Sequence, residues 1–402
     1  MSVGTRVYVR RQPVHDIDLK VLGYELLFDA HGNQHAGEDV DHLAARTMVS
    51  TFTEFSLDQL VGDRLAFLRL APPFVQGTMP VPFAPATAVL ILSAASLADP
   101  SRIEGLLGLA REGHLLGFDI TRGPVPADLA PFAAYLVVDM SLAGDGAIVK
   151  ARQEHSGSTA WVIATGVNDR AMFDRAVEGG ADYMSGRFLS RPDLVAGNGL
   201  SPTRLSSLTL LSRLAKPDVS VDELESVIKS DVALSYRVLR AANSASVGAA
   251  HTISSIRQAL ILLGPKRLKS WLLLMVVSDF GVPSEAQLAD TMARARICEL
   301  LAPALGLSTD DAFTAGLLSC LDVLLGVPLI DVLDRLPMDH EIRAALLDHQ
   351  GDLGKLLDVV TGYEAGDFGV IDQLGLEPYD LSRAYLEAVG WSLQTCESVL
   401  ST

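Results

Sequence analysis

The stretch that decides the fold of this chain lies near its N-terminus and reads Arg11-Gln12-Pro13-Val14-His15-Asp16-Ile17-Asp18-Leu19-Lys20-Val21-Leu22-Gly23-Tyr24-Glu25-Leu26-Leu27-Phe28-Asp29. The pattern predicts an opening β-hairpin with strands over 6–14 and 21–28. Its second strand carries one carboxylate, Glu25, among apolar neighbours. A buried acid costs several kcal/mol unless a metal ion, a base or a hydrogen-bond donor compensates it. The function of the chain therefore depends on which partners the remaining sequence supplies to Glu25.

Short apolar strands alternate with helical patterns through the first half of the chain. Together with the hairpin, the expected strands are 6–14, 21–28, 66–70, 88–92, 114–120, 135–140, 160–164 and 181–184. Helical stretches such as 101–112 and 169–179 lie between several of them. This alternation predicts a parallel sheet covered by helices, and a count near eight over roughly 190 residues fits a (β/α)₈ barrel. The antiparallel opening hairpin departs from a regular barrel.

Turn-forming residues over 190–199 mark a change of pattern. Beyond them the strand-type alternation vanishes and amphipathic helices follow. The expected helices are 204–215, 221–229, 233–243, 256–263, 265–277, 286–305 and 310–325. We therefore expect an α/β barrel domain over 1–195 and an all-α domain over 196–402.

Composition restricts the classes of partner. The chain has 402 residues, which is too long for one ordinary core, and its formal net charge is −17. Both halves are acidic, and neither contains a block of basic residues. Because sequence-independent binding to phosphate backbones needs clustered Lys and Arg, these features argue against direct nucleic-acid binding.

The cysteines and the apolar runs indicate a cytoplasmic protein. Cys298, Cys320 and Cys396 are far apart in sequence and form no metal-type or redox-type pair, so we expect reduced, mostly buried thiols. Arginines at 6, 10 and 11 interrupt any signal-peptide core. The longest apolar run, 271–277, is too short to cross a bilayer. We expect no membrane association.

Chemistry in a barrel of this type occurs where the C-terminal ends of the strands face a common mouth. Those ends carry Glu25, Arg69, Leu90, Asp119, Asp139 and Thr165. With Gln12-Pro13 and the closing stretch 183–192, this set resembles the EAL domain family over roughly residues 5–195. The resemblance implies a TIM-like barrel. It also implies kinship with phosphodiesterases that hydrolyse the bacterial second messenger cyclic di-GMP by means of two divalent cations.

The resemblance implies that Glu25 is the signature glutamate, within a signature that reads Glu-Leu-Leu here, and that Asp119 and Asp139 fall on two further ligand positions. Other positions depart from the family pattern. In this chain Arg69 replaces the family's metal-binding asparagine, and Leu90 and Thr165 replace glutamates. Ile120 replaces an aspartate, Val137 a lysine and Ser185 a glutamine.

These departures predict a catalytically degenerate barrel. A hydrophobic side chain cannot ligate magnesium, and an arginine stays protonated in proteins. We expect Arg69 to neutralise Glu25, Asp119 or Asp139 in a salt-bridged remnant of the site, with no metal and no catalytic residue. Three surviving carboxylates could still hold one Mg or Mn ion, which would leave a residual phosphodiesterase as one alternative.

Cyclic di-GMP binding without hydrolysis is a separate alternative. The candidate ligand-binding residues are Gln12, Glu25, Arg69, Asp119, Asp139 and Arg187, of which the glutamine and the two arginines are the phosphate donors. Asp29 stands where the signature of the family continues with arginine. Its negative charge near the phosphate region argues against this receptor function.

Two segments of the second half carry a further resemblance. Residues 231–245 and 253–264 look like the HDOD domain, a helical relative of the HD phosphohydrolases. The signature positions are Asp231, Asn243, Ser244, Ser255, Gln258 and Gly264. Asp231 and Ser255 are plausible helix N-caps, and Asn243-Ser244 is a plausible helix stop, so we interpret the signature as structural.

The helical half lacks the metal site of its hydrolytic relatives. The His-Asp dyad of an HD hydrolase would fall on Ser319-Cys320, and Asp339-His340 is in reversed order and predicted to be a surface loop. The ordered pair of domains resembles the two-domain EAL–HDOD signalling proteins of bacteria. We therefore expect a non-enzymatic regulatory or scaffold protein that acts through protein partners or self-association.

Overall fold

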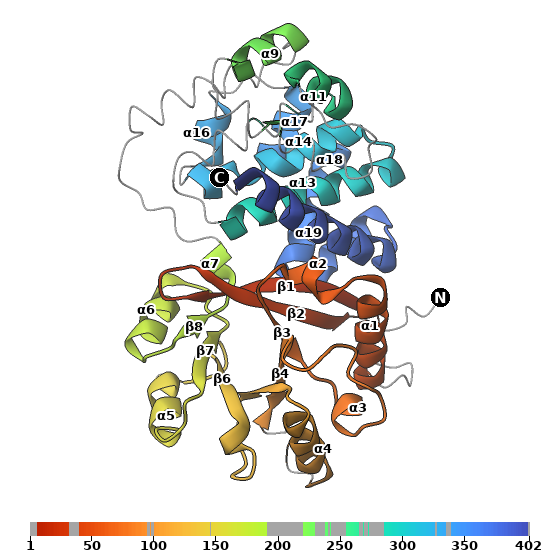
Figure 1. Cartoon of the computed structure of the whole chain (residues 1–402). Helices are drawn as coiled ribbons and strands as arrows, with labels where there is room; N and C mark the ends of the chain where they lie inside the picture. The colour runs from red at the N-terminus through yellow and green to blue at the C-terminus, as the bar shows by residue number, and fades with distance from the viewer. Residues whose placement is uncertain are drawn as a thin grey trace. The chain divides into compact units, whose positions relative to one another are not determined.

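The computed structural model describes residues 6–31, 40–94, 97, 100–144, 146–190, 220–229, 238–239, 242, 255–264, 268, 272, 285–325, 328–334 and 339–400. The chain divides into two compact units, Met1–Asp193 and Leu194–Thr402 (Figure 1). The predicted domain boundary at 195/196 lies outside the described residues and stays a prediction.

The strands described in the first unit close into a barrel in chain order. They are β1 (Arg6–Asp16), β2 (Val21–His31), β3 (Leu65–Arg69), β4 (Ala88–Ser93), β5 (Leu115–Asp119), β6 (Ala133–Asp139), β7 (Trp161–Thr165) and β8 (Tyr183–Met184). Strand β1 is antiparallel to both of its neighbours, β2 and β8. From β2 to β8 all pairs are parallel. The predicted barrel with an antiparallel opening strand is confirmed.

Helices lie around the outside of this barrel (Figure 1). They are α1 (Val40–Glu54), α2 (Leu57–Val61), α3 (Pro72–Val75), α4 (Pro100–Arg111), α5 (Ala147–Glu154), α6 (Arg170–Glu178) and α7 (Arg187–Ser190), with a 3₁₀ turn, η2 (Ala130–Phe132). Local chemistry explains where they begin. Ser56 and Gln59 form a capping box at α2, and the Asp169 side chain accepts from the backbone N–H of Met172 at α6.

Side-chain alternation divides each barrel strand into an inner and an outer face. The inner face packs as one apolar cluster formed by Val14, Phe67, Val89, Ile91, Tyr135, Val137 and Ile163. Two residues further along their strands, the same face carries Arg69, Asp139 and Thr165 at the C-terminal ends. The barrel is therefore filled with apolar side chains below a polar mouth.

The same alternation corrects one expectation. Leu90 lies between the inward-facing Val89 and Ile91, so it points to the outer side of the barrel wall, where it is fully buried. Ile91 instead pairs in register with Arg69 and faces the interior. The sequence could not make this distinction because β4 is apolar on both faces, as strands of a helix-covered parallel sheet are.

The described residues of the second unit lie in helices and turns. The helices are α9 (Val221–Lys229), α11 (Ile256–Leu263), α13 (Glu285–Leu301), α14 (Thr309–Leu318), α15 (Leu321–Leu325), α16 (Leu329–Leu333), α17 (His340–Asp348), α18 (Gly351–Ala365) and α19 (Pro378–Leu400), with 3₁₀ turns η3 (Ala302–Leu305) and η4 (Phe368–Leu374). The predicted helix 204–215 lies outside the described residues, as do most of 233–243 and 265–277. A helical second half is confirmed.

Two helix predictions differ from the structure. The helix expected over 310–325 is two helices, because α14 ends at Leu318 and the Ser319 hydroxyl donates to the carbonyl oxygen of Gly316 at 2.7 Å. Asp339-His340 is not a loop. Asp339 caps α17 by accepting from the backbone N–H of Glu341, and His340 is the first helical residue.

The hydropathy of the helices bears on membrane association. No helix within the described residues combines the length and apolar character needed to span a lipid bilayer.

Candidate functional site

The mouth of the barrel, formed by Glu25, Arg69, Ser93, Asp119, Asp139 and Thr165, gathers the polar side chains at the strand ends. Glu25 pairs in register with Gln12 of β1 and with Phe67 of β3, which places its side chain on the inner face. Ser93 pairs with Asp119, and Asp139 pairs with Thr165. The structure thus brings together five of the six strand-end residues that the sequence singled out, with Leu90 the exception.

Arg69 links two of the carboxylates across the mouth. Its Nε lies 2.9 Å from Glu25 Oε1, and its Nη1 lies 2.8 Å from Asp119 Oδ2. The arginine on β3 therefore reaches past β4 to β5. The Glu25 side chain is 6% exposed and that of Asp119 15%, whereas Arg69 is 42% exposed. One guanidinium compensates an almost fully buried carboxylate and a mostly buried one, as the sequence predicted for Arg69.

The electrostatics follow from these contacts. Burial alone would raise the pKa of Asp119, but hydrogen bonds from Thr121 and Arg69 and the charge of Arg69 outweigh it and hold that pKa below its ordinary value. Burial alone would lower the pKa of Arg69, yet the charges of Glu25 and Asp119 and their hydrogen bonds raise it. Arg69 thus favours the charged form of Asp119, and the charges of the two carboxylates favour the charged form of Arg69.

Asp139 lies in a separate hydrogen-bond arrangement on β6. Its Oδ1 accepts from the backbone N–H of Ser141 at 2.9 Å and from the Ser141 hydroxyl at 2.6 Å. Its own backbone N–H donates to the Thr121 hydroxyl oxygen at 2.8 Å. Gly166 follows with φ +67°, and a Cβ there would come within 2.5 Å of Asp139 Oδ1. Only glycine fits this position without displacing the carboxylate.

The remaining candidate positions divide by burial. The Ser185 hydroxyl, fully buried, donates to the carbonyl oxygen of Pro13 at 3.0 Å and ties the end of β8 to β1. Thr165 is 8% exposed, and its hydroxyl has no hydrogen-bond partner among the described atoms. Arg187 is exposed at the start of α7, whereas the Arg69 ion pair is formed by residues of β2, β3 and β5. The side chain of Asp29 lies outside the described part of the chain.

The residues present do not fit two divalent cations. The guanidinium of Arg69 lies between Glu25 and Asp119 and donates to both. The neighbouring inner positions on β4 and β6 are the buried hydrophobes Ile91 and Val137. Among the described residues, no three His, Cys, Asp or Glu side chains are placed to hold a metal ion. A two-metal site needs free hard oxygen ligands from several strands. In this mouth Glu25 and Asp119 accept from Arg69, and Asp139 accepts from Ser141.

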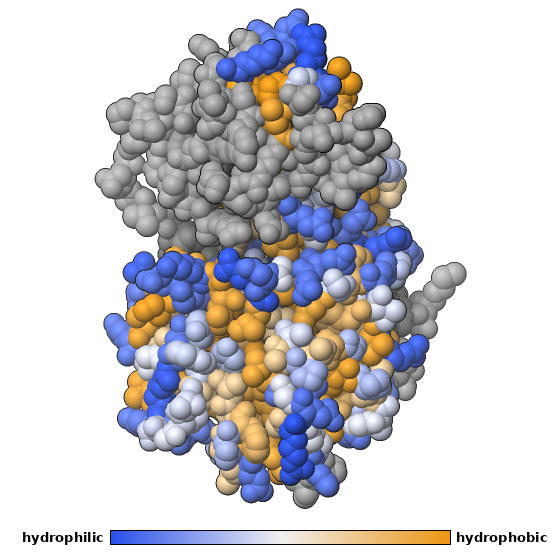
Figure 2. Space-filling view, in the orientation of Figure 1, coloured by the Kyte–Doolittle hydropathy of each residue, from blue (hydrophilic) through white to orange (hydrophobic). Residues whose placement is uncertain are grey.

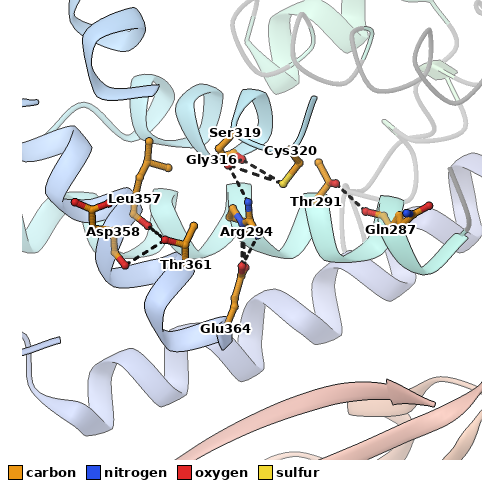
Figure 3. Close-up of polar contacts among 10 residues, drawn as sticks. All are labelled: Gln287, Thr291, Arg294, Gly316, Ser319, Cys320, Leu357, Asp358, Thr361 and Glu364. Atoms are coloured by element: carbon orange, nitrogen blue, oxygen red, sulfur yellow. Dashed lines mark hydrogen bonds and ion pairs between the residues drawn. The ribbon is translucent and has the colours of Figure 1, made fainter. Parts of the chain in front are cut away.

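The helical unit contains a second buried ion pair, formed by Arg294 and Glu364 (Figure 3). It lies beside Ser319 and Cys320, the positions where the His-Asp dyad would fall. Arg294 of α13 donates through Nε and Nη2 to Glu364 of α18, at 2.9 and 2.5 Å. Its Nη1 lies 3.2 Å from the Ser319 hydroxyl oxygen. The Arg294 side chain is 13% exposed. One guanidinium thus joins α13, α18 and the turn after α14.

Two cysteines adjoin this cluster. Burial raises the pKa of the Cys298 thiol and of the Cys320 thiol, and the charge of Arg294 only partly opposes it. Such thiols remain protonated and poorly nucleophilic. All three cysteines are free and buried, as predicted.

The described HDOD signature residues have structural roles. The Ser255 hydroxyl accepts from the backbone N–H of Gln258 at 3.2 Å and caps α11. Gly264, with φ 78°, ends the same helix. Asp231, Asn243 and Ser244 lie outside the described residues, so their predicted capping roles stay predictions.

Sequence reasoning missed the Arg294–Glu364 pair and the part played by Thr121. The two charged residues are separated by 70 positions, so no local pattern joins them. One signal was available. Arg294 lies in the sequence Met292-Ala293-Arg294-Ala295, whose other members are apolar and buried, and a charge on such a face predicts a buried partner.

Comparison with known proteins agrees with this arrangement. Residues 203–330 match the family model of the HDOD domain. The second unit therefore contains an HDOD domain. A closed barrel with an antiparallel opening strand, followed by an HDOD domain, fits a two-domain EAL–HDOD architecture.

Relatives match over almost the full chain. The uncharacterised protein YuxH of Bacillus subtilis (strain 168) is 26% identical over 400 residues, which cover 96% of this chain and 98% of that protein. The cyclic di-GMP phosphodiesterase CdgJ of Vibrio cholerae is 27% identical over 399 residues, covering 96% of this chain and 92% of that protein. The crystal structure of the EAL domain of Mycobacterium smegmatis DcpA aligns with a TM-score of 0.36 and 16% identity, covering 46% of this chain and 92% of that chain.

Proposed function

We propose that this chain is a non-enzymatic signal-transduction protein that acts by binding other proteins or a second copy of itself. The observation that carries the proposal is the Arg69 guanidinium, which donates to Glu25 and Asp119 within the mouth. Hydrolysis of a phosphodiester by two metals needs those carboxylates as ligands. In this chain they instead stabilise an arginine that stays protonated at any accessible pH.

The helical unit supports the same proposal. Ser319 and Cys320 stand where the sequence would need a His-Asp dyad, and Ser319 accepts a hydrogen bond from the buried Arg294. Both units thus have a framework of packed helices or strands and an arginine ion pair in the region where the hydrolytic relatives of each domain hold metal. A protein with these features is suited to recognition rather than to bond cleavage.

The surface offers apolar contacts for such recognition. Large hydrophobic side chains are exposed at Ile17, Leu19, Phe132 and Trp161, which flank the N-terminal ends of barrel strands. Hydrophobic residues are interspersed with hydrophilic ones over the visible face of the barrel unit (Figure 2). Scattered exposed hydrophobic side chains are common on protein surfaces, so the proposal rests on the Arg69 ion pair and not on them.

Chemical cross-linking and affinity capture of the full chain, together with light scattering at several concentrations, test this proposal. We expect either a concentration-dependent dimer or a defined protein partner, and we expect the same result for Glu25→Gln. A protein that remains an inert monomer and captures nothing specific would contradict it.

A second candidate function is that of a receptor for cyclic di-GMP. The name of one relative and the exposure of Arg69 favour it. The full-length relative CdgJ is named a cyclic di-GMP phosphodiesterase. The Arg69 side chain is also partly exposed at the mouth, where it could donate to a phosphate. Against it, the guanidinium already donates to two carboxylates, Glu25 and Asp119, whose negative charge disfavours a phosphate beside them. Calorimetry with the nucleotide at tens of micromolar protein separates the two functions, because only a receptor gives heat that Arg69→Ala abolishes.

A further inference from the structure

The turn between β1 and β2 presents two aliphatic side chains to solvent. Ile17 is 55% exposed and Leu19 is 39% exposed. The backbone N–H of Asp16 donates to the carbonyl oxygen of Lys20 at 2.9 Å, and that of Leu19 donates to the carbonyl oxygen of Asp16 at 3.1 Å. The Asp16 carboxylate also accepts from the backbone N–H groups of Asp18 and Lys20, at 2.9 and 2.8 Å. These hydrogen bonds fix the turn, so the two aliphatic side chains are displayed on an ordered element.

The backbone of Leu19 is strained. Its φ is +62°, in the left-handed region that disfavours residues with a Cβ and that glycine or asparagine adopts more readily. Three-residue hairpin loops place such a residue at this point, and glycine is the usual choice. Leucine is therefore unfavourable for the backbone here, and its side chain is incompletely buried. Strain of this kind persists at sites of function, which for an exposed leucine indicates contact with another molecule.

The turn continues into further apolar surface at the same end of the barrel. Asp16 pairs in register with Tyr183 at the start of β8. The Tyr183 ring packs against the interior cluster, and its centroid lies 5.8 Å from that of the Trp161 ring, which is 50% exposed. We call Ile17, Leu19, Trp161 and Tyr183 the hairpin-tip patch. It lies at the end of the barrel opposite the mouth, and it joins the barrel core to exposed side chains, as interaction sites do.

Charged residues border the hairpin-tip patch. Burial and then the charges of Asp182 and Asp16 raise the pKa of the Tyr183 hydroxyl, so both carboxylates act on the patch. Asp182 already forms an ion pair with an arginine. The turn itself carries two acids, Asp16 and Asp18, against one base, Lys20. The border is therefore negative, on a chain whose net charge is −17. Such a border attracts a positively charged partner and repels an acidic one.

We propose that the hairpin-tip patch docks a segment of another protein that combines apolar side chains with lysine or arginine, such as a basic amphipathic helix. A second copy of this chain fits less well, because a symmetric contact would bring the acidic border of one copy against the same border of the other. This inference rests on the proposed function and specifies the chemistry of the partner.

The inference and the proposed function fail in different ways. If the full chain captures a partner whose binding is unchanged by substitutions in the hairpin-tip patch, the docking site lies elsewhere and the proposed function stands. If the wild-type protein hydrolyses cyclic di-GMP, the proposed function fails, whatever the patch binds.

The experiment measures fluorescence anisotropy of three labelled peptides titrated with the full-length protein. The first is an amphipathic helical peptide of leucine and lysine. The second replaces its lysines with glutamate, and the third replaces its leucines with serine. We expect the leucine–lysine peptide to bind the wild type at least about tenfold more tightly than either of the others, because the patch requires both apolar contact and positive charge.

Variants place the binding on the patch. Ile17→Ser and Leu19→Asn should each weaken binding of the leucine–lysine peptide by about tenfold. The matched control is Leu142→Ser, because Leu142 is 61% exposed just after β6 ends, at the mouth of the barrel, and should bind as the wild type does. Leu19→Asn should also keep the melting temperature of the wild type, since asparagine tolerates the backbone at this position. If Leu19→Asn does not fold, Ile17→Ser decides the test.

Four results would overturn the inference. They are a wild type that does not bind the leucine–lysine peptide, equal affinities of Ile17→Ser and Leu142→Ser, equal binding of the leucine–glutamate peptide, and a concentration-dependent dimer in light scattering that Ile17→Ser abolishes. The last result would assign the hairpin-tip patch to a second copy of the chain.

Discussion

At the scale of single residues, the charge of the mouth depends on Asp119 and on the two residues that donate hydrogen bonds to it, Thr121 and Arg69. The carboxylate is mostly buried, which alone would favour its neutral form, yet hydrogen bonds from Thr121 and Arg69 keep it ionised. The folded state therefore binds the Asp119 proton less tightly than the unfolded state does, so ionisation of Asp119 stabilises the folded protein.

The Asp119 pair predicts a specific acid sensitivity. Because the pKa of this carboxyl is lowered on folding, the stability it contributes is complete above about pH 4, the ordinary value for an aspartate, and is lost as pH falls through the folded-state pKa. Urea unfolding of the full chain from pH 6 down to pH 3 should show a shallower loss of stability for Asp119→Asn than for the wild type. Asp174→Asn, which breaks an exposed pair, is the matched control. Parallel curves for wild type and Asp119→Asn would contradict this account.

The residues of the mouth could mostly be predicted from sequence, for a physical reason. Parallel strands present their C-terminal ends at one edge, so Arg69, Asp119 and Asp139 meet wherever the strands end. The prediction failed at Leu90, because a strand that is apolar on both faces gives no sign of which residues point inward. The sequence placed Thr165 at a strand end but could not show that its hydroxyl is buried and lacks a partner among the described residues, because that depends on packing.

At the scale of secondary-structure elements, the helical unit is organised around α13. The α13 helix packs against α14, α18 and α19, and Arg294 at its middle joins it to Glu364 of α18. The Arg294 side chain is 13% exposed and that of Glu364 is 22% exposed, so the arginine depends on the carboxylate for compensation of its charge.

Truncation of Arg294 should therefore be costly. Arg294→Ala removes a buried side chain and leaves the partly buried Glu364 carboxylate without its partner, and we expect a loss of about 3 kcal/mol in the free energy of unfolding. Guanidinium unfolding followed by circular dichroism measures it. The matched control is Arg170→Ala, whose exposed pair with Asp174 should contribute less than about 1 kcal/mol. Equal losses for the two variants would show that the Arg294 pair has no special role.

The close approach of α13 and α14 gives a second prediction at this scale. A Cβ at Gly316 would lie 2.8 Å from the Cα of Ala295 and 3.0 Å from Cys298 Sγ. Gly316→Ala should thus force the helices apart and destabilise the protein by about 1–3 kcal/mol. Gly108→Ala in α4 is the control, because a Cβ there meets nothing within 4 Å. It should be neutral or stabilising by up to about 1 kcal/mol. The proposed packing is wrong if both substitutions have the same sign.

Elements of the helical half were predictable in type but not in detail. Apolar periodicity identified the segments that became α9, α11 and α13. The break after α14 was missed, because Ser319 ends the helix through its own hydroxyl rather than through a glycine or proline. The packing of α13 against α18 could not be predicted from the sequence either, because the residues that meet, Arg294 and Glu364 among them, are far apart in the chain.

At the scale of the whole molecule, two units of different architecture share one feature. The barrel has Arg69 between two carboxylates, and the helical unit has Arg294 between Glu364 and Ser319. In each, an arginine side chain provides the positive charge from within the chain. A regulatory protein built this way would keep its shape whatever the supply of metal ions, which suits a partner-binding role.

The central claim is that the barrel mouth does not hydrolyse cyclic di-GMP, because Arg69 forms ion pairs with Glu25 and Asp119 and so keeps them from binding metal ions. Its most direct test is incubation of the full-length protein with cyclic di-GMP and either Mg²⁺ or Mn²⁺, with the nucleotide followed by chromatography. We expect the nucleotide to remain intact, with no linear product above that of a protein-free blank. Turnover by the wild-type protein that disappears in Glu25→Gln would contradict the claim.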